Sequence, residues 1–218
     1  MLPLPRTAAA VLGALALALP FSPPAAADPA TLPLAAAVDA LPVAEEDRTG
    51  YDRRLFRHWI DADRDGCNTR AEVLKAEAIV PPEQSAGCRL TGGLWHSYYD
   101  DVFVDDASSL DIDHMVPLAE AWDSGASQWS PARREAFAND LDYDPSLVAV
   151  TARSNRSKGD KDPAEWMPPA GHEHCRYVEE WTAVKHRWVL TVDQAEREAL
   201  LAVAGRCPDS TVEIVPAP

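Results

Sequence analysis

The sequence predicts an α+β fold organised around residues 111–169. Short apolar and β-branched runs lie within and before this segment, helical patterns follow it, and four cysteines suggest internal cross-links. The expected order in the centre is strand, insertion, strand and short helix. About 190 residues follow the N-terminal export signal, enough for one domain with a hydrophobic core, or for one domain with an accessory N-terminal lobe.

Residues 1–27 are predicted to be a signal peptide. Arg6 supplies positive charge, an apolar run of about twelve residues follows, and three alanines precede Asp28. A membrane anchor is the alternative, but this run is shorter than the roughly 20 residues that a bilayer requires, and prolines follow it. We therefore expect a secreted, extracellular protein whose mature form has no membrane segment.

The next two segments are expected to form a flexible lead-in, residues 28–46, and a helical segment, residues 47–88. The lead-in is rich in alanine, proline and leucine without clear periodicity. Between Tyr51 and Trp59, apolar side chains recur at helical spacing with arginines between them, which predicts an amphipathic helix.

Residues 61–72 match the pattern of an EF-hand calcium loop, with alternating carboxylates, a glycine at the sixth position and a final acidic residue. The predicted Ca²⁺ ligands are the side chains of Asp61, Asp63, Asp65 and Glu72 and the carbonyl oxygen of Cys67. Asn68 stands where an apolar residue is usual, and Cys67 can be tied into a disulfide. The alternative is an acidic turn followed by a capping box that begins at Thr69.

The four cysteines predict two disulfides, because their number is even, the chain carries an export signal and no C-x-x-C pair exists. Three pairings are open. Closeness in sequence favours one bond, and an antiparallel helix pair over residues 172–188 and 192–204 favours the other. The favoured bonds are Cys67 to Cys88 and Cys175 to Cys207.

The remaining elements follow from local patterns. Residues 94–99 and 110–114 are expected to form a small hairpin-like sheet around an acidic connection. Helices are expected at 118–122, at 130–139 and at the start of 152–160, with a strand at 147–151. The expected units are a core at 89–170 and a helical hairpin with a tail at 171–218, whose second helix opens with a capping box at Thr191 and Gln194.

The formal net charge of −15 argues against a protein that binds nucleic acid through its bulk charge. A metal ion and a local basic cluster could overcome this charge at one site. Binding to long nucleic acid would then be weak and sensitive to salt.

Two short motifs suggest phosphodiester cleavage. The first, residues 111–114, places a histidine beside a carboxylate, and the second, residues 154–160, places an asparagine among basic side chains. Together they offer a general base, ligands for a hard metal ion and contacts for phosphate.

These motifs resemble those of the HNH (ββα-metal) endonucleases. The likeness rests on residues 111–117, on the apolar run 147–150 and on residues 154–160, and it covers about sixty residues closely. The chain looks similar to secreted HNH proteins and to the C-terminal nuclease domain of modification-dependent restriction enzymes. The resemblance implies a ββα-metal core with additional helices.

The resemblance also implies residue roles. His114 would be the general base, and Asp113 and Asn155 would hold Mg²⁺ or Mn²⁺, which stabilises charge on the phosphate and the departing 3′ oxygen. Lys158, with Arg156 as second choice, would contact phosphate.

Three neighbouring positions complete this interpretation. Asp111 shares a strand face with Asp113 and could be an outer or second metal carboxylate. The middle asparagine of the family pattern falls at Ser146, whose hydroxyl could brace the loop only in part. Asn139 is a candidate substitute, with an ordinary helix C-terminus as the equal alternative.

The sequence thus predicts a secreted, monomeric, metal-dependent endonuclease. DNA is favoured over RNA, and low sequence specificity is expected because no base-reading module is present in the pattern. The competing hypothesis is a non-enzymatic, secreted calcium-binding module that engages a cell wall or a partner protein. A hydrolase of another phosphodiester is a third.

Overall fold

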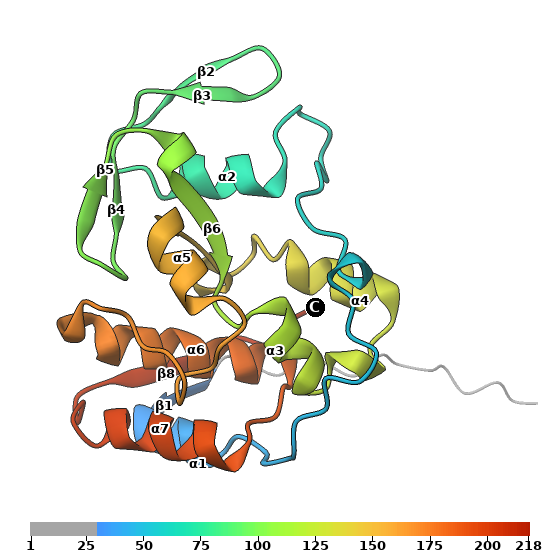
Figure 1. Cartoon of the computed structure of the whole chain (residues 1–218), viewed down its shortest axis with the longest axis vertical. Helices are drawn as coiled ribbons and strands as arrows, with labels where there is room; N and C mark the ends of the chain where they lie inside the picture. Colours follow the sequence, from blue (N-terminus) through green and yellow to red (C-terminus); the bar gives the residue numbers. More distant parts are fainter. Residues whose placement is uncertain (1–29) are drawn as a thin grey trace, which may run out of the picture.

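The computed structural model describes residues 30–218 as a mixture of helices and short strands (Figure 1). The predicted signal peptide, residues 1–27, lies outside this range. The helices are α1 (Leu34–Asp39), α2 (Thr69–Ala76), α3 (Leu118–Asp123), α4 (Pro131–Ala138), α5 (Ala152–Lys158), α6 (His174–Trp188) and α7 (Gln194–Ala204). The strands are β1 (Ala30–Pro33), β2 (Glu83–Ser85), β3 (Arg89–Thr91), β4 (Trp95–Ser97), β5 (Val102–Val104), β6 (Leu110–His114), β7 (Leu147–Thr151) and β8 (Thr211–Ile214).

The β6–β7 pair lies between two hydrophobic clusters. Val148 and Val150 of β7 belong to the larger cluster, which also takes in side chains of α1, α3, α4, α6 and α7. Ala149 lies between these two valines in β7, and Ile112 is its partner in β6. Both belong to a smaller cluster that also contains side chains of α2 and β4. This alternation buries both faces of β7 and leaves the side chains of Asp111 and Asp113 on the face of β6 opposite Ile112.

The central prediction of strand, insertion, strand and helix is confirmed. β6 and β7 pair antiparallel with Asp113 opposite Val148, and α5 begins directly after β7. The predicted helices α3, α4, α6 and α7 also form, with Ser130 capping α4 through its side chain. Asp193 caps α7, so the predicted capping box at Thr191 is wrong.

The flexible lead-in is wrong for residues 30–41. β1 pairs with β8 near the other end of the chain, and α1 places Leu34, Ala37 and Val38 in the larger cluster. α1 is short and largely apolar, and the partner of β1 lies far away in sequence. Neither a short apolar helix nor a strand with a distant partner produces a periodic pattern in the nearby sequence.

Two other sequence predictions are corrected. In place of a helix over 51–59, only a 3₁₀ turn at Arg53–Leu55 forms, and Trp59 has a φ of 59°, which no right-handed helix accommodates. In place of pairing between residues 94–99 and 110–114, β4 pairs with β5 inside the acidic connection. β6 therefore has β7 as its partner.

Both predicted disulfides are confirmed. The Cα atoms of Cys67 and Cys88 are 5.1 Å apart, and those of Cys175 and Cys207 are 5.9 Å apart. The second bond joins the start of α6 to the residues after α7, as expected for an antiparallel helix pair. Within residues 30–218, no helix is long and apolar enough to cross a membrane.

A buried ammonium group joins three helices. Lys185 of α6 is fully buried and donates to Glu120 of α3 at 2.6 Å and to Glu196 of α7 at 3.0 Å. The carboxylate of the exposed residue Glu46 lies close to those of Glu120 and Asp123. It also lies close to those of Asp162 and Glu196. Partial burial and the neighbouring Glu120 carboxylate raise the pKa of Glu46 from 4.5 to about 8.

The variant Glu46→Gln should therefore alter the pH dependence of stability. The folded protein holds the Glu46 proton up to about pH 8, whereas the unfolded chain releases it near 4.5, so its contribution to stability is lost as the pH rises through about 8. The amide stays neutral, so the variant should gain stability relative to wild type between about pH 6 and about pH 9. Urea unfolding at both pH values measures this difference.

Glu45→Gln is the matched control, since it removes the same charge from the adjacent position outside the carboxylate group. Equal pH responses of the two variants would contradict the assignment to Glu46. The other charged groups that face Glu46 are Glu120, Asp123, Asp162, Asp193 and Glu196, and Lys185 and Arg48 pair with members of this set.

Candidate active site

The end of β6 and the middle of α5 meet at a pocket of about 210 Å³. β6 contributes Asp113 and His114, α5 contributes Asn155 and Arg156, and Arg53 reaches the wall from the N-terminal 3₁₀ turn. Because α5 follows β7 without a loop and packs on β6, residues forty positions apart in sequence are brought together. The structure thus brings together four of the predicted site residues, Asp113, His114, Asn155 and Arg156.

The ring of His114 is held in one orientation. Its Nε2 lies 3.0 Å from the carbonyl oxygen of Ala138 at the end of α4, and the ring stacks on Phe137 with centroids 6.3 Å apart. A carbonyl only accepts hydrogen bonds, so Nε2 carries the hydrogen and Nδ1 keeps a free lone pair. Burial lowers the pKa of His114 to about 3, so the ring is neutral at pH 7.

Lys158 lies behind Asp113 and is fully buried. Its ammonium contacts Oδ2 of Asp113 and donates to the carbonyl oxygens of His114 at 3.0 Å and Met115 at 2.8 Å. These three oxygens match the three hydrogens of an ammonium group, and the hydroxyl oxygen of Tyr99 is a more distant fourth contact at 3.5 Å. Burial raises the pKa of Asp113, and the adjoining ammonium opposes this rise, which favours an ionised pair.

The predicted phosphate contact of Lys158 is therefore wrong for this structure. Ser154 and Lys158, one helical turn apart on α5, both face the interior, whereas Arg156 between them has a side chain that is 75% exposed. The sequence shows only that a lysine stands in a basic run. It does not show which face of α5 is covered.

The remaining ligand atoms at the pocket fit a hard metal ion. Asp113 uses Oδ2 for Lys158 and for the hydroxyl of Tyr99 at 2.7 Å, and its Oδ1 forms no hydrogen bond within residues 30–218. Asn155 donates from Nδ2 to Asp111 at 3.3 Å, and its Oδ1 is likewise without a partner in that range. One carboxylate oxygen and one amide oxygen suit Mg²⁺ or Mn²⁺, which keep several waters.

Asp111 orients its neighbours. Its Oδ2 accepts from Asn155 and lies 3.4 Å from Nε of Arg156. Within the described residues, neither Asp111 nor Asp113 belongs to a group of three acidic, histidine or cysteine ligands.

The two candidates for the middle asparagine have different contacts. Ser146 is buried and donates from Oγ to Asp140 at 2.7 Å. Asn139 caps the end of α4 and also accepts from Ile60 N at 3.1 Å and from Thr69 Oγ at 2.8 Å. Asn139 therefore ties residues 60–69 to the helix whose last carbonyl holds His114.

The structure adds site residues without a sequence signal. Tyr99 binds Asp113, the ring of Trp59 lies 5.3 Å from that of His114, and Arg53 lines the pocket. Tyr99 comes from the turn after β4, and the other two come from the segment with the wrongly predicted helix. Only the tertiary fold brings them to the site.

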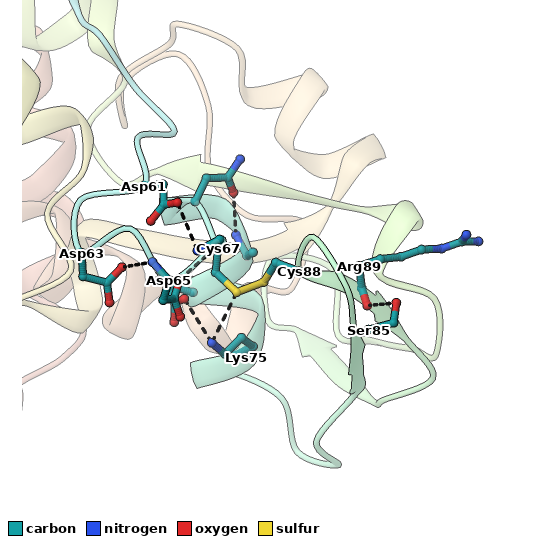
Figure 2. The surroundings of a disulfide bond; sticks show 12 residues. Asp61, Asp63, Asp65, Cys67, Lys75, Ser85, Cys88 and Arg89 are labelled. Carbon is teal, nitrogen blue, oxygen red and sulfur yellow. Dashed lines mark hydrogen bonds and ion pairs between the residues drawn. A yellow bond between two sulfur atoms is a disulfide. The ribbon is translucent and has the colours of Figure 1, made fainter.

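The acidic loop is a second cluster of oxygen ligands, beside the first disulfide (Figure 2). Carboxylate oxygens of Asp61, Asp63 and Asp65 lie within 4.8 Å of one another. The amide of Gly66 donates to Asp61 at 3.1 Å, and its φ of 97° is the turn conformation for which a glycine was expected. The sulfur of Cys67 is bonded to Cys88, so only its carbonyl oxygen remains as a ligand.

The end of this loop differs from the sequence prediction. α2 is capped by Asn68, whose side chain accepts from the amide of Ala71, so the alternative of a capping box that begins at Thr69 is wrong. Glu72 pairs with Lys75 at 3.1 Å. Its carboxylate would have to exchange this partner for a metal ion.

Comparison with known proteins agrees with the geometry. The family described as GmrSD restriction endonucleases, C-terminal domain, matches residues 73–203, a range that contains Asp113, His114 and Asn155. An uncharacterized secreted protein of Arthroderma benhamiae is 42% identical over 158 residues, which cover 72% of this chain and 76% of that protein. No solved structure matches.

The matched domain is of the restriction-endonuclease type, which supports a nuclease and implies nucleic acid as its substrate. The chain belongs to the family of GmrSD restriction endonuclease C-terminal domains.

The variant Lys158→Met should destabilise the protein, because it leaves Asp113 as a buried charge without its partner. We expect the free energy of unfolding to fall by about 3 kcal/mol, measured by urea denaturation. Lys161→Met, an exposed lysine on the same segment, should change it by less than about 0.5 kcal/mol. Adding Asp113→Asn to Lys158→Met should restore part of the loss, and no recovery would contradict an ionised pair.

Proposed function

We propose that this protein is a secreted, metal-dependent endonuclease of the HNH (ββα-metal) kind. The supporting observation is that Nδ1 of His114 and the free oxygens of Asp113 and Asn155 belong to residues that line one pocket. These residues stand on an antiparallel strand pair followed by a helix, the order that a ββα-metal core requires.

His114 acts as the general base in this proposal. Its Nδ1 accepts a proton from the attacking water, and Ala138 and Phe137 keep the ring from turning. The imidazole is neutral at pH 7, the form that can accept a proton.

Asp113 and Asn155 would hold Mg²⁺ or Mn²⁺. When bound, the ion supplies Lewis-acid stabilisation of charge on the scissile phosphate and the departing 3′ oxygen. Lys158 and Tyr99 hold Asp113 through Oδ2 and so keep Oδ1 available. Arg156, largely exposed at the pocket, replaces Lys158 as the phosphate contact.

DNA is the proposed substrate. The matched family is one of restriction endonucleases, a class of enzymes that cleave DNA. Because the net charge is −15, a polyanion is attracted only by the local basic side chains at the pocket. We therefore propose that a monomer cleaves DNA with low sequence specificity and that cleavage is sensitive to salt.

The test of this function is plasmid digestion with Mg²⁺ or Mn²⁺. Wild type should nick and linearise the plasmid, EDTA should stop it, and His114→Ala should lower the rate at least about 100-fold, because the general base is lost. His172→Ala is the control, since this histidine is exposed and away from the pocket. Equal rates for wild type and His114→Ala would refute the mechanism.

We also propose that the loop from Asp61 to Glu72 binds a structural Ca²⁺. Three clustered carboxylates, a positive-φ glycine and an available carbonyl at Cys67 support this site. The disulfide to Cys88 limits how far the loop can open without the ion. This proposal is shared with the competing hypothesis of a non-enzymatic calcium-binding module, which predicts no plasmid cleavage with any metal.

Calcium should raise the thermal midpoint of unfolding of wild type. At a free concentration of about 100 times Kd, the gain should be about 2.7 kcal/mol if the unfolded chain does not bind the ion. Asp63→Asn should remove most of this gain, whereas Asp105→Asn, an exposed carboxylate outside the loop, should keep it. Thermal unfolding with millimolar Ca²⁺ measures the shift, and its absence in wild type would exclude the site.

A further inference from the structure

We propose that Arg53 binds the nucleic-acid backbone, so that Arg53 and Arg156 are two guanidinium groups that hold phosphates at the His114 pocket. This inference rests on the proposed nuclease function and extends it to a residue that lies outside residues 73–203, the range matched by the family. Arg53 would add a second phosphate contact to that of Arg156, which takes the place of Lys158.

The position of Arg53 is set by its local structure. Arg53 begins a 3₁₀ turn that is capped by Asp52, whose carboxylate accepts from the amide of Arg54. At the other end of the turn, Phe56 is fully buried and packs against Phe137, the residue that also stacks on His114. The turn is therefore fixed to the same helix that orients the general base, while Arg53 itself stays exposed.

The distribution of charge in the pocket favours a phosphate-binding role for Arg53. Among the described residues, Arg53 and Arg156 are the only lysine or arginine side chains that line it. Arg53 and His114 line the same pocket, so the guanidinium and the imidazole face the same bound ligand. A cation in this position attracts the anionic substrate toward the base.

Arg53 also differs from its basic neighbours in having no carboxylate partner within residues 30–218. Arg54 pairs with Asp52, and Arg57 pairs with Glu135. In a chain with a net charge of −15, an arginine that stays unpaired beside a pocket keeps its full charge for an external anion.

The chemistry of a guanidinium fits this role. Arginine donates two parallel hydrogen bonds to phosphate oxygens and stays charged at every pH of interest. Contacts to phosphate carry no base information, so two arginines at the pocket give affinity and register without sequence preference. The expected ligand is therefore the sugar-phosphate backbone of DNA on both sides of the cleaved bond.

The test compares Arg53→Ala with Arg54→Ala. Both remove one exposed arginine from the same turn, but only Arg53 lines the pocket. In a non-cleaving His114→Ala background with Mg²⁺, the anisotropy of a short fluorescent duplex gives Kd over a range of salt concentrations. Arg53→Ala should weaken binding about tenfold and reduce the slope of log K against log salt by about one, equally for unrelated sequences.

Arg54→Ala should change Kd by less than about twofold. Arg53→Lys should keep part of the affinity that Arg53→Ala loses, because lysine retains the positive charge but not the bidentate hydrogen bonding of arginine. In the cleaving protein, Arg53→Ala should lower kcat/KM while circular dichroism and the thermal midpoint stay unchanged.

Three results would overturn the proposal: no effect of Arg53→Ala, equal effects of Arg53→Ala and Arg54→Ala, or weakened binding with an unchanged salt slope. These failures are distinct from failure of the nuclease function, which the wild-type plasmid assay decides separately. A wild type that cleaves plasmid while Arg53→Ala binds normally would leave the nuclease intact and remove Arg53. A wild type that neither cleaves nor binds DNA would remove both.

Discussion

The ion pair between Lys158 and Asp113 is the interaction on which the rest of the site depends. The ammonium of Lys158 also binds the carbonyls of His114 and Met115, so one buried charge from α5 satisfies the backbone where β6 ends. A regular strand would place adjacent side chains on opposite faces. The end of β6 at this point allows Asp113 and His114 to line the same pocket.

Much of the fold follows from local sequence patterns. The strand pair, the helix α5, the C-terminal helices and both disulfides were predicted because each leaves a periodic or spacing signal within a short window. For the same reason, Asp113, His114 and Asn155 were placed at one site by their motifs.

What the sequence did not show depends on contacts between distant segments. The burial of Lys158 is set by the aromatic rings of Tyr99, Tyr177 and Trp181, whose centroids lie 5.6 to 5.8 Å from its ammonium. The pairing of β4 with β5 was missed because β5 lies inside the acidic segment between residues 99 and 110, whose composition suggested a loop. Asn139 connects the acidic loop to α4 through two acceptor contacts, a link between two candidate metal sites that no local motif contains.

The pairing of β1 with β8 bears on when the chain can finish folding. Ala30 lies opposite Ile214, so β1 has no partner until the residues of β8 have been synthesised. Closing so long a loop is entropically costly, and the Cys175–Cys207 bond forms in the same late portion. For the secreted nuclease proposed above, this order of assembly would delay a complete fold until the chain has left the cell whose DNA it could damage.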